Sequence, residues 1–194
     1  MTSRFGIVRR KKPRLSSGRK STEGGFEVAA PSTGVTRVER DWDGRYFEDF
    51  ELGVTYEHAT GRTIDGQDNA WFTLLTNNNN EIHFNSEYAA AGLYGRRLVN
   101  SCLTLAVVTG LSVAGISRNA AANLGWDEVR LPAPVYEGDT LRARSTVIEL
   151  RPSASRPDVG IVKVATEGFK QDGTVVISFN RTVMVWRRDR PPAE

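Results

Sequence analysis

The chain of 194 residues is long enough to bury a hydrophobic core and short enough to form a single domain. Its 39% hydrophobic and 25% charged residues are typical of a soluble globular protein and argue against a collagen-like, wholly disordered or membrane-embedded chain. The single cysteine, Cys102, excludes an intramolecular disulfide framework and a multi-thiolate zinc site. It also favours a reducing compartment, so we expect a cytoplasmic protein.

The net charge of +3 is unevenly distributed along the chain. Residues 1–20 contain eight Lys or Arg and no acid, which leaves 18 basic against 23 acidic residues in the other 174. Little periodicity runs from residue 1 to about 40, and we predict a disordered basic arm over 1–40. Such an arm would bind nucleic acid or an anionic membrane surface through its charge, but a solvated extension has the same composition. We expect neither a nucleic-acid nor a membrane partner.

Membrane and export signals are weak. The longest apolar run, Leu103–Ile116, is shorter than the ~20 residues that a membrane span needs. Basic residues precede any hydrophobic run at the N-terminus, which argues against a secretory signal. The segment Arg4–Ser21 also resembles a mitochondrial transit peptide in composition, although Pro13 and Gly18 would interrupt its helix.

The first predicted elements after the arm are a strand and a helix. Tyr56–Thr63 has the pattern of a strand. Asp65 is a plausible N-cap with Asp68 at the capping-box position, and together they predict a helix over 66–76. The helix should end at Asn77–Asn80, because asparagine side chains compete for backbone hydrogen bonds. Within the helix, apolar residues follow the helical spacing i, i+3, i+4 at Trp71, Leu74 and Leu75.

A long apolar helix and a run of strands follow. Ser86–Ala91 can form a short helix, and Asn100 and Ser101 can cap the apolar run that ends at Ile116. This run has hardly any polar face, so we expect the helix to be enclosed on most sides. The four predicted strands are Asn123–Leu131, Thr140–Leu150, Gly160–Lys170 and Thr174–Arg188.

These elements predict the fold class. Asp172-Gly173 is a strong hairpin signal between the last two strands. In the last strand an apolar face is interrupted by Arg181. One long buried helix and an antiparallel meander predict a single α+β domain over 41–190, with the helix on one face of the sheet.

Histidine is the scarcest catalytic residue type, since the chain has only His58 and His83. His58 lies in the middle of a predicted strand, and we interpret it as a hydrogen-bonded structural residue. His83 follows the asparagine loop, whose amides could hold a water or a carbonyl group, and it can be a structural or a catalytic residue.

The region around His83 resembles the MaoC-like (R)-specific enoyl-CoA hydratases and dehydratases of the hot-dog fold. The family motif runs Gly-Asp-x-Asn-Pro-(aliphatic)-His, then five residues and a small one. The same frame here reads Asn77-Asn78-Asn79-Asn80-Glu81-Ile82-His83, followed by Phe84–Tyr88 and Ala89. The segments Gly95–Ser101, Gly125–Pro132 and Val135–Asp139 are similar to later parts of the family, and the resemblance covers about residues 42–188.

Within that family the chain is most similar to the mesaconyl-CoA hydratase (β-methylmalyl-CoA dehydratase) branch, through Trp71–Thr76, Ile82–Asn85, Leu98–Ser101 and Asn123–Pro132. The resemblance implies a hot-dog domain whose antiparallel sheet wraps around a long central helix. It implies a hydro-lyase that adds water to an enoyl-CoA thioester without a metal or redox cofactor, as a homodimer or higher homo-oligomer. A dehydratase of straight-chain or carrier-protein-linked (R)-3-hydroxyacyl thioesters and a non-catalytic acyl-CoA-binding subunit are the alternatives.

The family uses an aspartate and a histidine around one water. His83 occupies the histidine position, but the aspartate position holds Asn78, which cannot accept a proton. One hypothesis is that His83 alone moves the proton while Asn78 and Asn80 orient the water. A second gives the acid role to Glu81, because residues 81 and 83 point to the same side of an extended segment.

The resemblance also implies binding groups for the thioester. Backbone N–H groups at the start of the central helix would bind the oxyanion, and the hydroxyl of Ser101 or the amide of Asn100 could add a contact. Cations would bind the CoA phosphates or a substrate carboxylate. The candidates are Arg62, Arg96, Arg97 and Arg130.

Overall fold

The computed structural model describes residues 38–39 and 44–190. The predicted basic arm therefore lies outside the described residues, apart from strand β1 (Val38–Glu39), which pairs in parallel with β2 (Thr55–Glu57). None of the helices in the described part of the chain has the length and apolar character of a membrane span.

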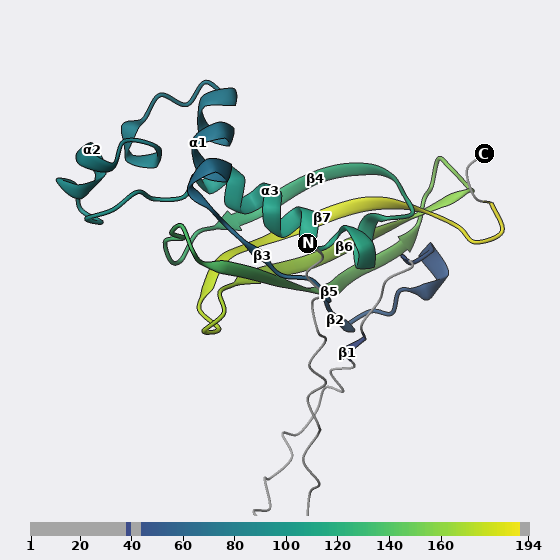
Figure 1. Ribbon diagram of the computed structural model, residues 1–194. Helices are drawn as coiled ribbons and strands as arrows, with labels where there is room; N and C mark the ends of the chain where they lie inside the picture. The colour runs from purple at the N-terminus through teal and green to yellow at the C-terminus, as the bar shows by residue number, and fades with distance from the viewer. Residues whose placement is uncertain (1–37, 40–43, 191–194) are drawn as a thin grey trace, which may run out of the picture. The chain divides into compact units, whose positions relative to one another are not determined.

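Four long strands form most of one antiparallel sheet (Figure 1). They are β4 (Ala120–Arg130), β5 (Thr140–Pro152), β6 (Val159–Phe169) and β7 (Val175–Trp186). The strand order is β1-β2-β5-β6-β7-β4, and β3 (Arg62–Thr63) pairs with β5. The α+β class and the antiparallel meander are confirmed. β4 forms one edge of the sheet, and its pairing with β7 is interrupted by three register shifts.

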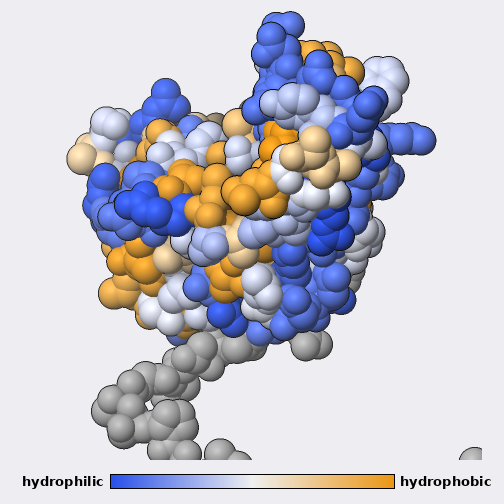
Figure 2. Space-filling model, turned by 90° about the vertical axis from the view of Figure 1, so that its left-hand side faces the viewer, coloured by the Kyte–Doolittle hydropathy of each residue, from blue (hydrophilic) through white to orange (hydrophobic). Residues whose placement is uncertain are grey.

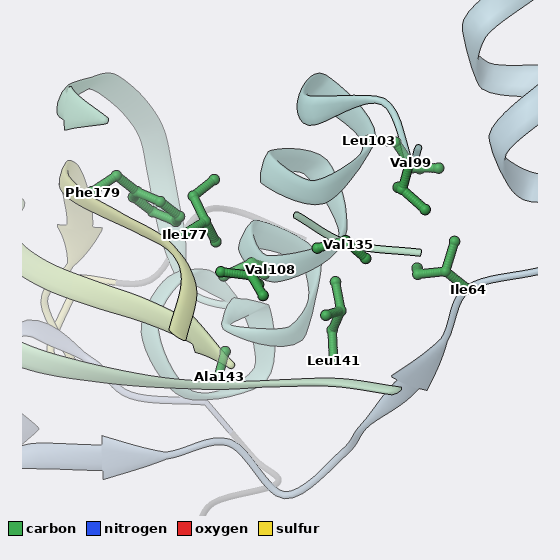
Figure 3. Close-up of a cluster of buried hydrophobic side chains, with 10 residues drawn as sticks. Ile64, Val99, Leu103, Val108, Val135, Leu141, Ala143, Ile177 and Phe179 are labelled. Atoms are coloured by element: carbon green, nitrogen blue, oxygen red, sulfur yellow. The ribbon is translucent and has the colours of Figure 1, made fainter. Parts of the chain in front are cut away.

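Helix α3 (Ser101–Leu111) lies along one face of this sheet and continues into a π-helical turn over Val113–Ser117 (Figure 1). The two layers approach closely at Gly168 in β6, where an added Cβ would lie 2.5 Å from Cγ2 of Val108. Figure 3 shows Val108 among the side chains that fill the space between helix and sheet. The buried members of this cluster are Ile64, Val99, Leu103, Val108, Val135, Leu141, Ala143, Val176, Ile177 and Phe179.

A second buried cluster lies around Tyr56 and Ile116. On β7 the predicted apolar face is confirmed, since alternate residues from Ile177 to Val185 are buried. Arg181 lies within that face and is itself buried, as the sequence interruption indicates.

The smaller helices gather at one end of the sheet, where α1 (Gly66–Leu75) and α2 (Ser86–Ala90) project from the domain (Figure 1). The predicted capping box of α1 is confirmed, because Asp65 accepts hydrogen bonds from the N–H groups of residues 67 and 68. Two 3₁₀ turns, Phe47–Asp49 and Glu81–His83, complete the helical part. On this side of the molecule, hydrophobic side chains form a band between polar ones (Figure 2).

Three expectations about these elements are wrong. The strand predicted over 56–63 is two short strands, β2 and β3. Glu57 and Arg62 are five residues apart but pair with Arg144 and Leu141, which are only three residues apart in β5. The residues between β2 and β3 therefore loop out. Helix α3 is not enclosed on most sides in the described chain. It is exposed at Ser101, Cys102, Ala106 and Gly110, and Val113 is exposed in the π-helical turn that follows.

The third correction concerns α1. The apolar side chains that share one face, Trp71, Leu74 and Leu75, are exposed by 74%, 56% and 79%. The fully buried positions are instead the polar residues Asn69 and Thr73. The helical period was right, but the side of α1 that packs against the domain carries Asn69, Thr73 and the half-buried Phe72.

The close approach of α3 to β6 predicts that Gly168→Ala destabilises the domain. The new methyl group would push Val108 and Ile177 apart, and we expect a loss of about 1–3 kcal/mol in the free energy of unfolding. Denaturant titration followed by circular dichroism measures it. Gly110→Ala is the control, since its Cβ meets nothing within 4 Å and alanine raises helix stability by up to about 1 kcal/mol. Equal stabilities for the two variants would contradict this account of the packing.

Candidate functional site

His83 lies at the end of the 3₁₀ turn and is buried, with its Nδ1 at 2.8 Å from the carbonyl oxygen of Leu98. A carbonyl oxygen can only accept, so Nδ1 must carry the proton. In the neutral imidazole, Nε2 then has a free lone pair. Nε2 makes no hydrogen bond within the described residues. The geometry therefore presents His83 as a base through Nε2.

The asparagine run forms the turn that places His83. Asn77 ends α1 in a left-handed conformation with φ of 58°, which asparagine tolerates better than most residues. The side-chain oxygen of Asn78 accepts from the N–H of Asn80 at 3.0 Å, and that of Asn80 accepts from the N–H of Ile82 at 3.3 Å. Both amide oxygens are thus used inside the turn. Asn78 and Asn80 each keep an NH₂ group and one lone pair of the oxygen with which they could orient a water.

The extended segment that we assumed around Glu81 is wrong, because residues 81–83 form a 3₁₀ turn. In a helix with three residues per turn, positions i and i+2 do not share a side. The Glu81 carboxylate is exposed and accepts a hydrogen bond of 2.6 Å from Asn85 Nδ2. Among the described residues it makes no contact with His83.

Asn100 is the N-cap of α3, and its side-chain oxygen accepts from the N–H of Cys102 at 2.9 Å. Its Nδ2 donates to Thr73 Oγ1 at 3.2 Å. The predicted capping is confirmed, and the side chain of this buried residue makes one hydrogen bond through each of its two polar atoms.

Ser101, the first residue of α3, opens onto a cavity of about 220 Å³. Apolar side chains line most of it, including Val99, Leu131 and Val135. Leu98, whose carbonyl binds His83, lines the same cavity. The short segment 98–101 therefore links the carbonyl that holds His83 to the start of α3, although His83 itself does not line this cavity.

Two of the predicted arginines lie together in a neighbouring cavity of about 340 Å³, formed with Ser86, Tyr136 and Glu137. The guanidinium of Arg96 stacks on the ring of Tyr136 at 3.7 Å, and Lys170 lies 5.3 Å from the same ring. Arg97 forms an ion pair of 2.7 Å with Glu137. Arg96 is the member of this pair without an acidic partner in the described chain.

The other two arginines do not line these cavities. Arg62 is exposed and binds both carboxylate oxygens of Asp68, at 2.7 and 2.8 Å. This contact raises the pKa of Arg62 and lowers the pKa of Asp68. Arg130 donates to the carbonyl of its neighbour Val129 and lines a separate cavity over β4, β6 and β7.

His58 has the structural surroundings that its sequence position predicts. It is buried, and its Nε2 lies 3.0 Å from Ser145 Oγ, which in turn lies 2.9 Å from Thr166 Oγ1. Burial, together with the positive charges of Arg45 and Arg181, lowers the pKa of His58 to about 4. His58 is therefore neutral at physiological pH.

The sequence interpretation missed Asn69 and Thr73, the buried polar pair on α1. The two residues are four apart, so they share one face of α1, opposite Trp71, Leu74 and Leu75. This spacing in the sequence could have indicated a buried polar face. In the described residues no group of three or more His, Cys, Asp and Glu side chains is arranged to hold a metal ion.

Comparison with known proteins identifies the family. The profile of a family described as mesaconyl-CoA hydratase matches residues 27–194. The mesaconyl-CoA hydratase of Cereibacter sphaeroides is 41% identical over 146 residues, which cover 75% of this chain and 42% of that protein. The β-methylmalyl-CoA dehydratase of Chloroflexus aurantiacus is 40% identical over 146 residues, covering 75% and 41%.

Solved structures show the same fold. A MaoC domain protein of Chloroflexus aurantiacus, 37% identical, superimposes with a TM-score of 0.71 over 85% of this chain and 45% of that chain. A Mycobacterium tuberculosis protein described as having a double hot-dog fold gives a TM-score of 0.68 at 26% identity, over 77% and 47%. The domain is therefore a hot-dog domain. The chain spans about two fifths of the length of the curated relatives it matches.

The lowered pKa of His58 predicts an acid-sensitive fold. Below pH 6.5 His58 becomes protonated in the unfolded chain, whereas in the folded chain it becomes protonated only near pH 4. The free energy of unfolding should therefore fall as the pH is lowered through this window. We expect His58 to contribute roughly 2–3 kcal/mol of that fall. Denaturant titrations of the wild type and His58→Gln at pH 7 and pH 4.5 measure it. The same pH dependence in both proteins would disprove the assignment.

Proposed function

Because the chain belongs to the mesaconyl-CoA hydratase family, we propose that it is a hydro-lyase that interconverts mesaconyl-CoA and β-methylmalyl-CoA. The observation that carries this proposal is the state of His83. Its Nδ1–H is bound by the Leu98 carbonyl, its Nε2 is left without a protein partner in the described chain, and Leu98 itself lines the cavity at the start of α3.

The hydration needs one group that moves a proton twice. Nε2 of His83 accepts a proton from water while the oxygen of that water bonds to Cβ of the enoyl thioester. The electron pair of the double bond moves onto Cα and the thioester oxygen. The imidazolium then returns its proton to Cα, so no proton is gained or lost. The NH₂ groups of Asn78 and Asn80 orient the water by donating to it.

The thioester oxygen needs hydrogen-bond donors while it carries negative charge. The N–H and the hydroxyl of Ser101 supply them, since the N–H of Cys102 is bound by Asn100, and the helix dipole adds a favourable field. The apolar wall of the cavity, including Val99 and Leu131, fits the acyl part and the arm of the thioester. The base and the donors come from the chain itself, so the proposed reaction needs no metal or redox cofactor.

The dicarboxylic substrate and the CoA phosphates carry negative charge. Arg96 lines one cavity with Arg97 and stacks on the ring of Tyr136. Lys170 lies 5.3 Å from the same ring but forms an ion pair of 2.7 Å with Asp139. We assign the anionic group to Arg96, because Arg97 is neutralised by Glu137 and Arg62 by Asp68. Arg130 takes no part in this site.

The partner that we propose is a second copy of the chain, paired through β4. This edge strand exposes large apolar side chains, and its outer side has no strand partner among the described residues. They are Leu124, Trp126 and Val129, with Leu131 directly after the strand. A relative that is described as a double hot-dog is about twice as long as the matched region, which supports two such units in one assembly. The free Cys102 continues to favour a cytoplasmic location.

The role of His83 predicts that His83→Ala lowers kcat/KM for mesaconyl-CoA by about 10²–10⁴-fold. The loss of absorbance of the conjugated thioester measures the rate. Crotonyl-CoA, a straight-chain substrate without the second carboxylate, is measured beside it, and we expect mesaconyl-CoA to be preferred.

Glu81→Gln is the control for this experiment, because the carboxylate is exposed and bound to Asn85. Unchanged kinetics would remove Glu81 from the mechanism. A wild-type protein that binds mesaconyl-CoA without turnover would instead favour a non-catalytic acyl-CoA-binding subunit. Preference for crotonyl-CoA would favour a straight-chain dehydratase.

The proposed pairing predicts a particle of about 43 kDa, twice the 21.5 kDa of one chain, in sedimentation equilibrium. Trp126→Glu places a charge in the middle of the edge strand and should shift the equilibrium to monomers. Ile148→Glu is the matched control, because Ile148 is exposed by 44%, as Trp126 is by 45%, but lies on β5. A monomeric wild type, or dissociation by the control alone, would refute this interface.

A further inference from the structure

Asn69 lies in the second turn of α1 and is fully buried, but it has no part in the mechanism above. Its Nδ2 donates to the carbonyl oxygens of His83 at 2.8 Å and Leu98 at 3.0 Å. Its Oδ1 accepts from the N–H of Asn100 at 2.9 Å. One side-chain amide therefore connects α1 to the turn that carries the base and to the N-cap of α3.

The carbonyl of Leu98 is the centre of this arrangement. It accepts from Asn69 Nδ2 and from His83 Nδ1, so both of its lone pairs are used by side chains. The neighbouring N–H groups have backbone partners, because Leu98 donates to Ile82 and Val99 donates to Val135. Asn69 is the additional donor that holds this oxygen in place for the imidazole.

We propose that Asn69 is a positioning residue that holds His83 in the Nδ1–H tautomer and fixes the distance between this base and the start of α3. The base role of His83 rests on the proposed function, whereas the tautomer does not. Asn69 acts through the backbone of Leu98 and Asn100 and does not touch the substrate.

The chemistry of the position explains why an amide is needed there. Two carbonyl oxygens require two donors, and the Asn100 N–H requires an acceptor, which together match the side-chain amide of asparagine. Leucine has a similar volume and offers neither. Aspartate keeps the acceptor but places a second oxygen against the two carbonyls. Thr73, one turn later, contacts Asn100 and not Leu98.

The test is the tautomeric state of His83, read from the side-chain ¹⁵N shifts of the full-length protein. The chain has only two histidines, so His58 serves as an internal reference for the fold. We expect the Nδ1–H tautomer for His83 in the wild type. In Asn69→Leu we expect a mixture of both tautomers, unchanged His58 signals, and a kcat for mesaconyl-CoA that falls about 10–100-fold with little change in KM.

Thr73→Val is the matched control, because it also removes a buried hydrogen bond of α1 but leaves both donors on the Leu98 carbonyl. It should retain the wild-type tautomer. Asn69→Asp, which keeps the volume, replaces Asn69→Leu if the leucine variant does not fold.

Two results would overturn the proposal. One is a wild-type His83 in the Nε2–H tautomer, which needs no variant to detect. The other is a folded Asn69 variant with the wild-type tautomer and kcat. If the wild type hydrates no enoyl-CoA, the proposed function fails, and the tautomer comparison still decides the role of Asn69.

Discussion

The site depends on how the polar backbone groups of residues 98–100 are satisfied. Buried N–H and C=O groups need partners, and this segment lies beside α1 where no strand can supply them all. Its N–H groups bind Ile82, Val135 and the side chain of Asn69, while the carbonyl of Leu98 binds two side chains. The hydrogen bonds that offset the cost of burying this segment also orient the imidazole of His83 and fix the N-terminus of α3. Stability and function of this region are therefore not separable.

The two histidines show how position changes the chemistry of one residue type. His58 is bound at Nε2 by Ser145, and its Nδ1 is buried without a hydrogen-bond partner in the described chain. Burial and the charges of two arginines keep it neutral. His83 is bound on one nitrogen only, by a neutral carbonyl. A base needs an accessible lone pair on a fixed ring. The unpartnered nitrogen of His58 is sealed from solvent, whereas Nε2 of His83 is not. Composition alone could not rank these two residues, but their local sequences did.

Local signals predicted much of the fold because they act over a few residues. The Asp65 capping box, the Asp172-Gly173 turn and the period of two in β7 all appear as expected. The errors come from interactions between distant segments. The side of α1 that carries Asn69 packs inward because Asn69 bonds the backbone at residues 83, 98 and 100. The loop after β2 forms because β5 has too few residues between Arg144 and Leu141 to pair with all residues from Glu57 to Arg62. The turn at Glu81 likewise follows from a cap by Asn80, whose side-chain oxygen accepts from the N–H of Ile82.

The register shifts of β4 have a consequence for what this strand can join. A straight apolar edge of eleven residues would accept almost any extended chain, including copies stacked without limit. The shifts after Ala120, Asn123 and Asp127, with Glu128 in a left-handed conformation, bend the edge several times within its length. An incoming strand must follow the same bends to form continuous hydrogen bonds. The irregular backbone of β4 therefore limits which strands can pair with it and disfavours aggregation, while its exposed apolar side chains can still bind a matching partner.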